Sequence, residues 1–125
     1  MIDFQRLLQQ EFETVTPEAY YEINRSPKVV YPYLTYTHGT EDITGNQEGF
    51  YITVSIFHYG PSIGPLLDLE ERLRSHFHKQ RLFTPEVFMQ VTLIGADTVP
   101  TNEEQLRRRD VRLFCKIDWR KKEWQ

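Results

Sequence analysis

The sequence has one cysteine, no long hydrophobic run and no glycine-rich phosphate-binding motif, and each absence removes a class of protein. A single thiol, Cys115, excludes an internal disulfide framework and a cysteine-rich zinc site, and it favours a reducing compartment. The first twelve residues include acidic side chains and no apolar stretch long enough for a signal peptide or a membrane span. Residues 60–65 contain two glycines but also two prolines and no lysine, which excludes a phosphate-binding loop. We therefore expect a soluble chain, made in the cytoplasm, without membrane association.

Catalytic and metal-binding patterns are also missing. His76 and His78 are two residues apart on an expected helix and so do not share a face, and no HExxH, CxxC or carboxylate cluster accompanies the histidines. Cys115 lies in the inward register of an apolar strand, where cysteine acts as a small hydrophobe. Glu70 and Glu71 are adjacent on a helix and are expected to face water, a poor arrangement for an acid–base pair. The sequence predicts no enzyme, no cofactor and no metal site.

The composition fits one domain, residues 1–125, with 39% hydrophobic and 14% aromatic residues. A net charge of −3 argues against a general nucleic-acid binder. The charge is uneven: residues 1–60 carry three Lys or Arg against eight Asp or Glu, whereas residues 107–125 carry eight against three. Uneven charge is common in small domains. An acidic body with a basic end also allows copies of the chain to contact one another head to tail.

The clearest structural signal is the alternation of β-branched and aromatic residues over positions 50–59, which is typical of a strand well inside a sheet. A second alternation, over residues 107–119, directs one set of side chains inward. That set comprises Val111, Leu113, Cys115, Ile117 and Trp119.

Helical spacing and turn residues complete the predicted order αββαββ. This order predicts an α+β domain, with a single mixed or antiparallel sheet of about four strands and two main helices packed on it. The first half is expected to contain a helix over 2–12, a polar segment over 13–28 with a short helical turn at 17–21, and strands over 29–37 and 50–59 joined by a polar loop over 38–48. The second half is expected to contain a helix from Pro65 to about His78 and strands over 87–96 and 107–119. Between these two strands we expect a connector in which Thr101 and Glu104 form a capping box.

The arginines 107–109 form the sharpest charged feature, and three interpretations stay open. Arginine forks match phosphate geometry, so the cluster can contact phosphate. It can equally be a solvated strand entrance that discourages edge pairing. The third interpretation is a contact with the acidic loop of a neighbouring copy, which we favour because the rest of the chain is acidic. The expected interface then comprises His38, Thr40, Glu41, Asp42, Glu48, Arg107, Arg108 and Arg109.

Several short motifs occur in a familiar order. They are PYLTY at 32–36, the aromatic strand at 50–59, DLEERL at 68–73, DTVP at 97–100, and LRRR at 106–109 leading into the last strand. In this order they resemble the tail terminator, or tail completion, proteins of long-tailed bacteriophages, also called head–tail joining proteins. The resemblance covers about residues 2–120. The proline-rich turn at 60–65 and the basic ending KKEWQ depart from it.

The resemblance implies a structural role in a phage or prophage. Such proteins form rings, usually hexamers, on the head-proximal end of the tail tube, where they end tail elongation and mediate head–tail joining. The implied partners are other copies of the chain, the tail tube protein and the head connector or neck protein, while DNA passes through without specific binding. The implied location is the virion, after assembly in the host cytoplasm. The alternative is a small non-catalytic binding or adaptor module that acts as a monomer or dimer.

Overall fold

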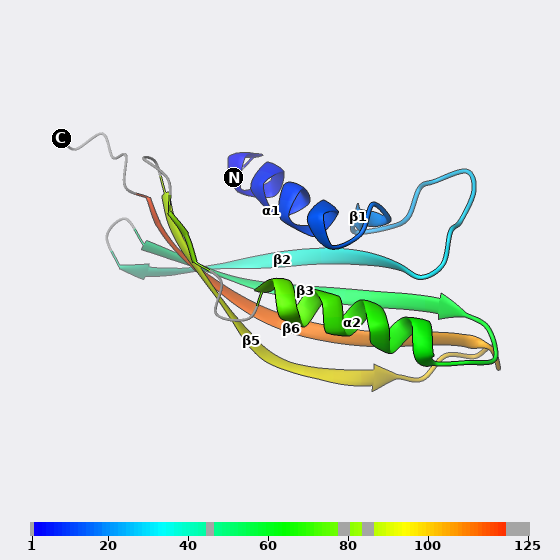
Figure 1. Cartoon of the computed structure of the whole chain (residues 1–125). Helices are drawn as coiled ribbons and strands as arrows, with labels where there is room; N and C mark the ends of the chain where they lie inside the picture. The colour runs from blue at the N-terminus through cyan, green and yellow to red at the C-terminus, as the bar shows by residue number, and fades with distance from the viewer. Residues whose placement is uncertain (1, 45–46, 78–80, 84–86, 120–125) are drawn as a thin grey trace.

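Two helices lie against one face of a six-stranded sheet in the computed structural model, which describes residues 2–44, 47–77, 81–83 and 87–119 (Figure 1). The helices are α1 (Ile2–Val15) and α2 (Gly64–Phe77). The strands are β1 (Ala19–Tyr21), β2 (Tyr33–Thr44), β3 (Gln47–Tyr59), β4 (Arg81–Phe83), β5 (Val87–Val99) and β6 (Leu106–Trp119).

The strands are ordered β1-β2-β3-β6-β5-β4 across the sheet. The pairing of β1 with β2 is parallel and the other four pairings are antiparallel, so the sheet is mixed. This confirms the predicted α+β class with two helices on one sheet. The expected number of about four strands was too low, because β1 and β4 are only three residues long and carry no readable alternation.

The core lies between the helices and the sheet. The Phe12 ring of α1 packs 4.4 Å from the Tyr36 ring of β2 and 5.2 Å from the Phe77 ring of α2, measured between centroids. The four inward residues of β6 that the structure describes are buried as the alternation predicts; the side chain of Trp119 lies outside the described part. The sheet residues of the core are Ala19, Leu34, Tyr36, Phe50, Ile52, Val54, Ile56, Met89, Val91, Val111, Leu113, Cys115 and Ile117.

Three of the expected local structures were wrong. The expected loop over 38–48 is mostly strand, because β2 continues to Thr44, β3 begins at Gln47, and the ladder pairs Glu41 with Gly49. Ladder hydrogen bonds use the backbone, so polar residues can extend a hairpin beyond the core. The expected helical turn at 17–21 is replaced by β1, and β2 begins at Tyr33 rather than at residue 29. A proline at position 32 cannot donate to the ladder.

The expected capping box was also wrong. The Thr101 hydroxyl donates to the carbonyl oxygens of Glu103 and Leu106, at 2.8 and 2.6 Å. The connector between β5 and β6 is therefore a closed turn and not the start of a helix.

Candidate functional site

The two halves of the expected interface lie at opposite ends of the sheet. At one end, Asp42 pairs with Glu48 and Gln47 pairs with Asp118. At the other end, residues 56–58 of β3 pair with the three arginines of β6. Nine residues of β3 separate Glu48 from the partner of Arg108, which corresponds to about 30 Å along the strand. Within one chain, the acidic hairpin and the arginine cluster are therefore kept apart.

His38 lies in β2 and not in a loop. Its side chain is half-buried on the helix-covered face, where its Nε2 is 3.3 Å from the Gln5 Oε1 of α1. Its ring lies against the rings of Tyr21 and Phe50, with centroids 5.6 and 6.0 Å away. Burial lowers the pKa of His38 below its usual 6.5. These contacts connect His38 to the interior of the fold.

The other hairpin residues of the expected interface lie farther along the same two strands. Thr40 is exposed in β2, and Glu48 is half-buried in β3. Glu41 and Asp42 belong to the β2 ladder, while their side chains lie outside the described part of the chain. The predicted acidic segment is thus the end of a two-stranded hairpin that extends past the helices (Figure 1).

The arginine cluster does not act as one patch, because successive residues of a strand point to opposite faces. Arg107 and Arg109 lie on the helix-covered face and Arg108 lies on the other. The guanidinium of Arg107 donates to the carbonyl oxygens of Gly60 and Pro61, at 3.3 and 3.1 Å. Arg107 therefore holds the turn between β3 and α2 against the start of β6.

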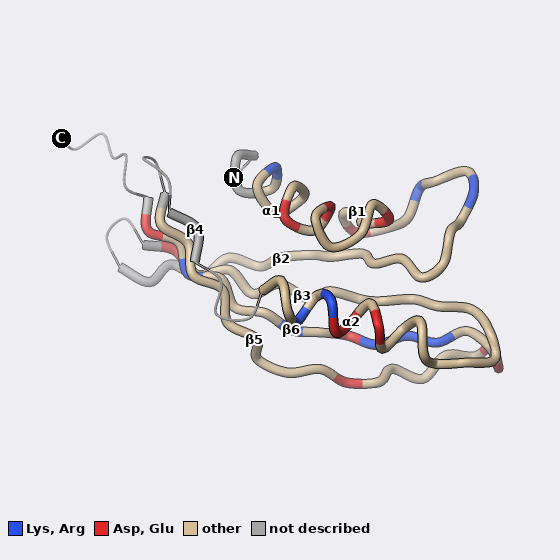
Figure 2. The backbone as a smooth tube through the Cα atoms, viewed as in Figure 1, with Lys and Arg blue, Asp and Glu red and all other residues tan. Residues whose placement is uncertain are grey.

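Arg109 forms an ion pair with Glu70 of α2, whose side chain is only 7% exposed. Glu70 also accepts from Arg74 at 3.0 Å, and Arg109 donates to the Thr98 hydroxyl of β5 at 3.0 Å. Figure 2 shows the acidic and basic residues of α2 beside those of β6. The expectation that Glu70 faces water was wrong, because Arg109 provides a buried carboxylate with a charged partner.

Arg108 lies on the face of the sheet that the helices do not cover. It donates to both carboxylate oxygens of Asp110, at 3.0 and 3.2 Å, and to the Ser55 hydroxyl at 3.4 Å. Its guanidinium carbon also lies 5.5 Å from the centre of the Phe57 ring, within the range of a cation–π contact. The Arg108 side chain is 37% exposed, and of the three arginines it is the one that another molecule can contact on the open face.

These contacts narrow the three interpretations of the cluster. Strand β6 lies between β3 and β5, so the cluster does not protect a sheet edge. Each of the three guanidinium groups is bonded within the chain, so a phosphate would have to replace existing partners. The contact between copies stays a prediction, and Arg108 is its best-placed residue.

Sequence reasoning missed the aromatic groups on the open face. Tyr33 and Phe57 stack with ring centroids 5.0 Å apart, and Tyr51 lies 4.9 Å from Phe114. Tyr51 is half exposed. The available signal was the outward half of the alternation in β3, which carries tyrosines and phenylalanine where a simple solvent face carries charged or small residues.

The sequence also did not reveal two open strand edges. Strand β1 covers β2 only from Leu34 to Tyr36, and β4 covers β5 only from Phe88 to Gln90. No other described strand pairs with the outer edges of β2 over 37–44 or of β5 over 91–99. Open edges present unpaired backbone donors and acceptors, which are ready to pair with another strand.

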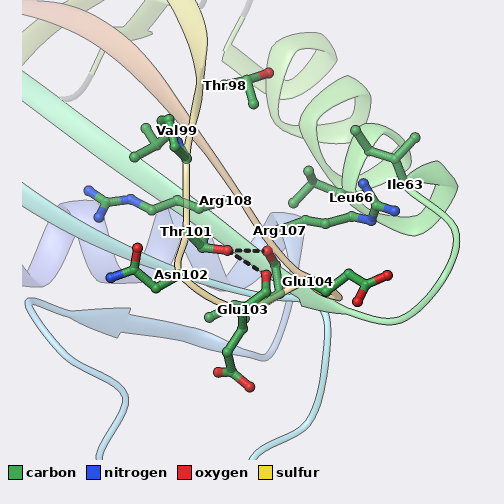
Figure 3. A pocket seen from close by; sticks show the side chains of 12 residues that line it. Ile63, Leu66, Thr98, Val99, Thr101, Asn102, Glu103, Glu104, Arg107 and Arg108 are labelled. Carbon is green, nitrogen blue, oxygen red and sulfur yellow. Dashed lines mark hydrogen bonds between the residues drawn. The ribbon is translucent and has the colours of Figure 1, made fainter.

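A pocket of about 450 Å³ lies where α2 begins, beside the connector from β5 to β6 (Figure 3). Ile63 and Leu66 come from the start of α2, and Val99, Pro100 and Leu106 come from the end of β5, the connector and the start of β6. Glu103, Glu104, Arg107 and Arg108 supply the charged part of the lining. The pocket thus combines apolar walls with charges of both signs.

Reactive groups within the described residues are few. Cys115 is fully buried, and burial raises the pKa of its thiol to about 12, which keeps it protonated. The described part of the chain contains no group of three His, Cys, Asp or Glu side chains that is suited to a metal ion. Neither described helix is long and apolar enough to cross a membrane.

The fold and these surfaces define an α+β protein whose sheet has one face that the described helices leave uncovered and two edges that the described strands leave partly unpaired. The sequence matches no known protein family and no curated protein. Among solved structures, it is similar to a chain of the virion of a native gene transfer agent (GTA) particle, with a TM-score of 0.72 and 11% sequence identity. The alignment covers 88% of this chain and 90% of that chain. At this identity, the likeness establishes a shared fold over nearly the whole of both chains.

Proposed function

We propose that this chain is a structural virion protein of a phage or prophage that caps the head-proximal end of the tail tube as an oligomeric ring. In this role it ends tail elongation and mediates the joining of head and tail. Its partners are other copies of itself, the tail tube protein and the head connector. The role needs no catalytic residue and no cofactor, because binding and shape carry it out.

One observation carries the proposal: the fold extends over 88% of the chain in common with a chain of a virion particle. The order of short motifs over residues 2–120, which resembles tail terminator proteins, gives the finer assignment. Since the structural likeness covers 88% of this chain and 90% of that chain, it concerns most of the domain and not a short common fragment.

The arrangement of charge supports assembly by unlike surfaces. Glu48 and Asp118 lie at one end of the sheet, and the arginines of β6 lie about 30 Å away at the other. A contact between different surfaces of identical copies closes into a ring when the rotation between copies suits. The net charge of −3 also suits the wall of a channel through which DNA passes without binding, because like charges oppose phosphate binding.

The open strand edges provide an alternative contact between copies, in which the copies lie side by side. The four long strands alternate in direction, so β5 is antiparallel to β2. If neighbouring copies have the same orientation, β5 of one copy meets β2 of the next as an antiparallel pair. The open segments 91–99 and 37–44 are offset along the strands, and strand tilt in a closed sheet accommodates such an offset.

The test of the function is electron microscopy of lysates from the parent phage with a stop codon early in this gene. We expect filled heads beside separate, overlong tails, because an uncapped tube continues to grow and cannot join the head. Normal infectious particles would overturn the proposal and leave the adaptor module as the better explanation. Heads without any tails would also overturn it, since the role would then lie in building the tube.

The edge contact is tested by comparing Ile94→Lys with Leu67→Lys. Ile94 is 51% exposed in the open segment of β5, and Leu67 is 44% exposed on α2. Both changes add the same charge at a similar exposure, and lysine on an open edge opposes strand pairing. We expect Ile94→Lys to reduce ring formation in native mass spectrometry while Leu67→Lys assembles normally. If both variants form rings equally well, the proposed edge contact between copies is excluded.

The charge contact is tested by Arg108→Glu. The substitution places a like charge opposite the acidic hairpin of a neighbour, so we expect loss of assembly at low ionic strength. Native mass spectrometry at low and high salt measures the effect. An Arg108→Glu chain that assembles like the original would exclude the arginine contact between copies.

A further inference from the structure

The pocket at the start of α2 has the size of a ligand site but lacks an assigned occupant. Its volume of about 450 Å³ falls within the usual range for binding pockets, roughly 300–1,000 Å³. Leu66 is buried in its wall, whereas Ile63 is 38% exposed. Figure 3 shows Ile63 and Leu66 on the helix side of the pocket, with Glu103 and Glu104 on the connector. An apolar side chain with charged neighbours of both signs would suit this combination of glutamates and arginines.

The sequence supplies such a segment immediately after β6. Residues 120–125 read RKKEWQ, which places three basic residues and one acidic residue before Trp124. We propose that the pocket binds residues 120–125 of a neighbouring copy, with Trp124 against its apolar wall. This inference rests on the proposed charge contact, in which the hairpin end of one copy meets the arginine end of the next, and it identifies a second contact at that junction.

The length of the chain requires that the occupant come from another copy. Strand β6 runs the whole length of the sheet, from the pocket at Leu106 to the opposite end at Trp119 (Figure 1). Eleven residues separate Arg108 from Trp119, which corresponds to about 36 Å along the strand. Six further residues span about 20 Å when fully extended. The segment cannot return to the pocket of its own chain.

The charges of the pocket match those of the segment. Glu103 and Glu104 are exposed, and no described residue forms an ion pair with either carboxylate. Both lie on the connector that lines the pocket, and they suit the basic residues 120–122. The guanidinium of Arg107 lies beside the turn at Gly60 and Pro61, and it suits Glu123 next to the tryptophan.

We expect Trp124 to contribute most of the binding free energy of this contact. Tryptophan is enriched among the residues that dominate binding, because its large ring removes much apolar surface from water. Exposed charge pairs at the rim contribute less and weaken with salt. The contact therefore depends mainly on Trp124 and Ile63 and secondarily on the glutamates.

The experiment measures binding of a fluorescein-labelled peptide of residues 119–125 to the full chain by fluorescence anisotropy. The receptor is the full-length Trp124→Ala chain, whose own segment does not compete for the pocket. We expect saturable binding that falls at least about tenfold when the peptide carries Trp124→Ala or the receptor also carries Ile63→Asp. The matched receptor with Leu67→Asp, an exposed leucine of α2 outside the lining, should bind within about twofold of the parent.

A further measurement sharpens the result. Replacing Glu103 and Glu104 with lysine should weaken peptide binding at low salt more than at high salt. The inference is overturned if the peptide does not bind saturably, if the Trp124→Ala peptide binds equally well, or if Ile63→Asp has no effect.

The peptide test is independent of virion assembly, because the segment is supplied as a separate molecule. Peptide binding together with normal particles from the stop-codon phage would overturn the proposed virion role and support the pocket. Separated heads and tails without peptide binding would support the virion role and overturn the pocket.

Discussion

The two faces of the sheet are made by alternate residues of the same strands, yet they have different chemistry. The helix-covered face is aliphatic and aromatic, and Leu34, Ile52 and Leu113 on it are almost completely buried. The open face carries half-exposed rings such as Tyr51 and paired charges such as Arg108 with Asp110. The covered face determines the stability of the fold, while the open face is available for contacts that the fold itself does not need.

The largest expected difference between the faces comes from removing one ring on each side. Phe12→Ala should lower the free energy of unfolding by about 3–5 kcal/mol, because Phe12 is fully buried between Tyr36 and Phe77. Tyr51→Ala, on the open face, should lower it by about 1 kcal/mol or less. Urea denaturation of both variants measures the effects. Equal losses would show that the open face contributes to stability as much as the core does.

The next effect concerns two neighbouring glutamates of α2. Glu70→Ala should lower the free energy of unfolding by about 2 kcal/mol, because it leaves Arg109 without its carboxylate partner beneath the helix. Glu71 is exposed on the same helix, so Glu71→Ala is the matched control and should change stability by about 0.5 kcal/mol at most. Chemical denaturation of both variants measures the difference in their free energies of unfolding. A Glu71→Ala chain that lost as much stability as Glu70→Ala would contradict the buried role of Glu70.

A smaller effect appears at high pH. Tyr36 is fully buried and bonds to Gln5 and Gln9 of α1, and burial raises its pKa from 10.0 to about 12. The unfolded chain releases this proton first, so the stability contribution is complete below pH 10 and is lost as the pH rises toward 12. The loss at pH 11 is about 1.4 kcal/mol.

Tyr36→Phe isolates this titration from those of Tyr20, Tyr33 and Cys115, whose pKa values are also raised. The variant lacks the hydroxyl, so its stability should decline less between pH 9 and pH 11 than that of the parent chain. Denaturation curves at each pH provide the comparison. Parallel declines in the two chains would exclude Tyr36 as a source of the pH dependence.

The smallest effect is expected for the charge pair between Arg112 and Asp97 on the open face. Both side chains are well exposed, at 43% and 65%. Asp97→Ala should therefore change the free energy of unfolding by less than about 0.5 kcal/mol. Set beside Glu70→Ala, this variant tests the same chemistry on the two faces. A loss as large as that of Glu70→Ala would mean that exposure does not decide the strength of these pairs.

Alternation was the part of the sequence that predicted the fold well. The inward positions Val111, Leu113, Cys115 and Ile117 are all buried, because a sheet with one covered face imposes a period of two on its apolar residues. The second helix was also predicted nearly to its bounds. Both features depend on contacts that leave a regular mark on the local sequence.

The missed features depend on partners that are distant in the sequence. Strand β1 forms because the β2 backbone lies beside it, and the hairpin beyond residue 37 forms by pairing with β3. Glu70 is buried because Arg109, 39 residues later, reaches it from the sheet. No local pattern encodes these pairings, so the sequence indicated a loop and a solvated glutamate instead.

The sequence did not predict how the residues of the candidate site are arranged, and their role as an interface stays a prediction. Arg107, Arg108 and Arg109 are adjacent in sequence, and the strand distributes them over two faces with different partners. His38 was expected in a loop and instead contacts Gln5 of α1. Charge density alone did not distinguish the arginine that faces the open side from those that hold the fold together.

The ends of the sheet also differ, since the β2–β3 ladder ends with the pair Thr44 and Gln47 at one end and α2 begins beside the pocket at the other. A ring closed through the strand edges, with all copies in a single orientation, would therefore have two unlike rims. Such a ring has a direction along its axis, and a partner suited to one rim would not fit the other. A single polypeptide can therefore form a junction between two different structures, and no second protein is needed to determine the orientation of the ring.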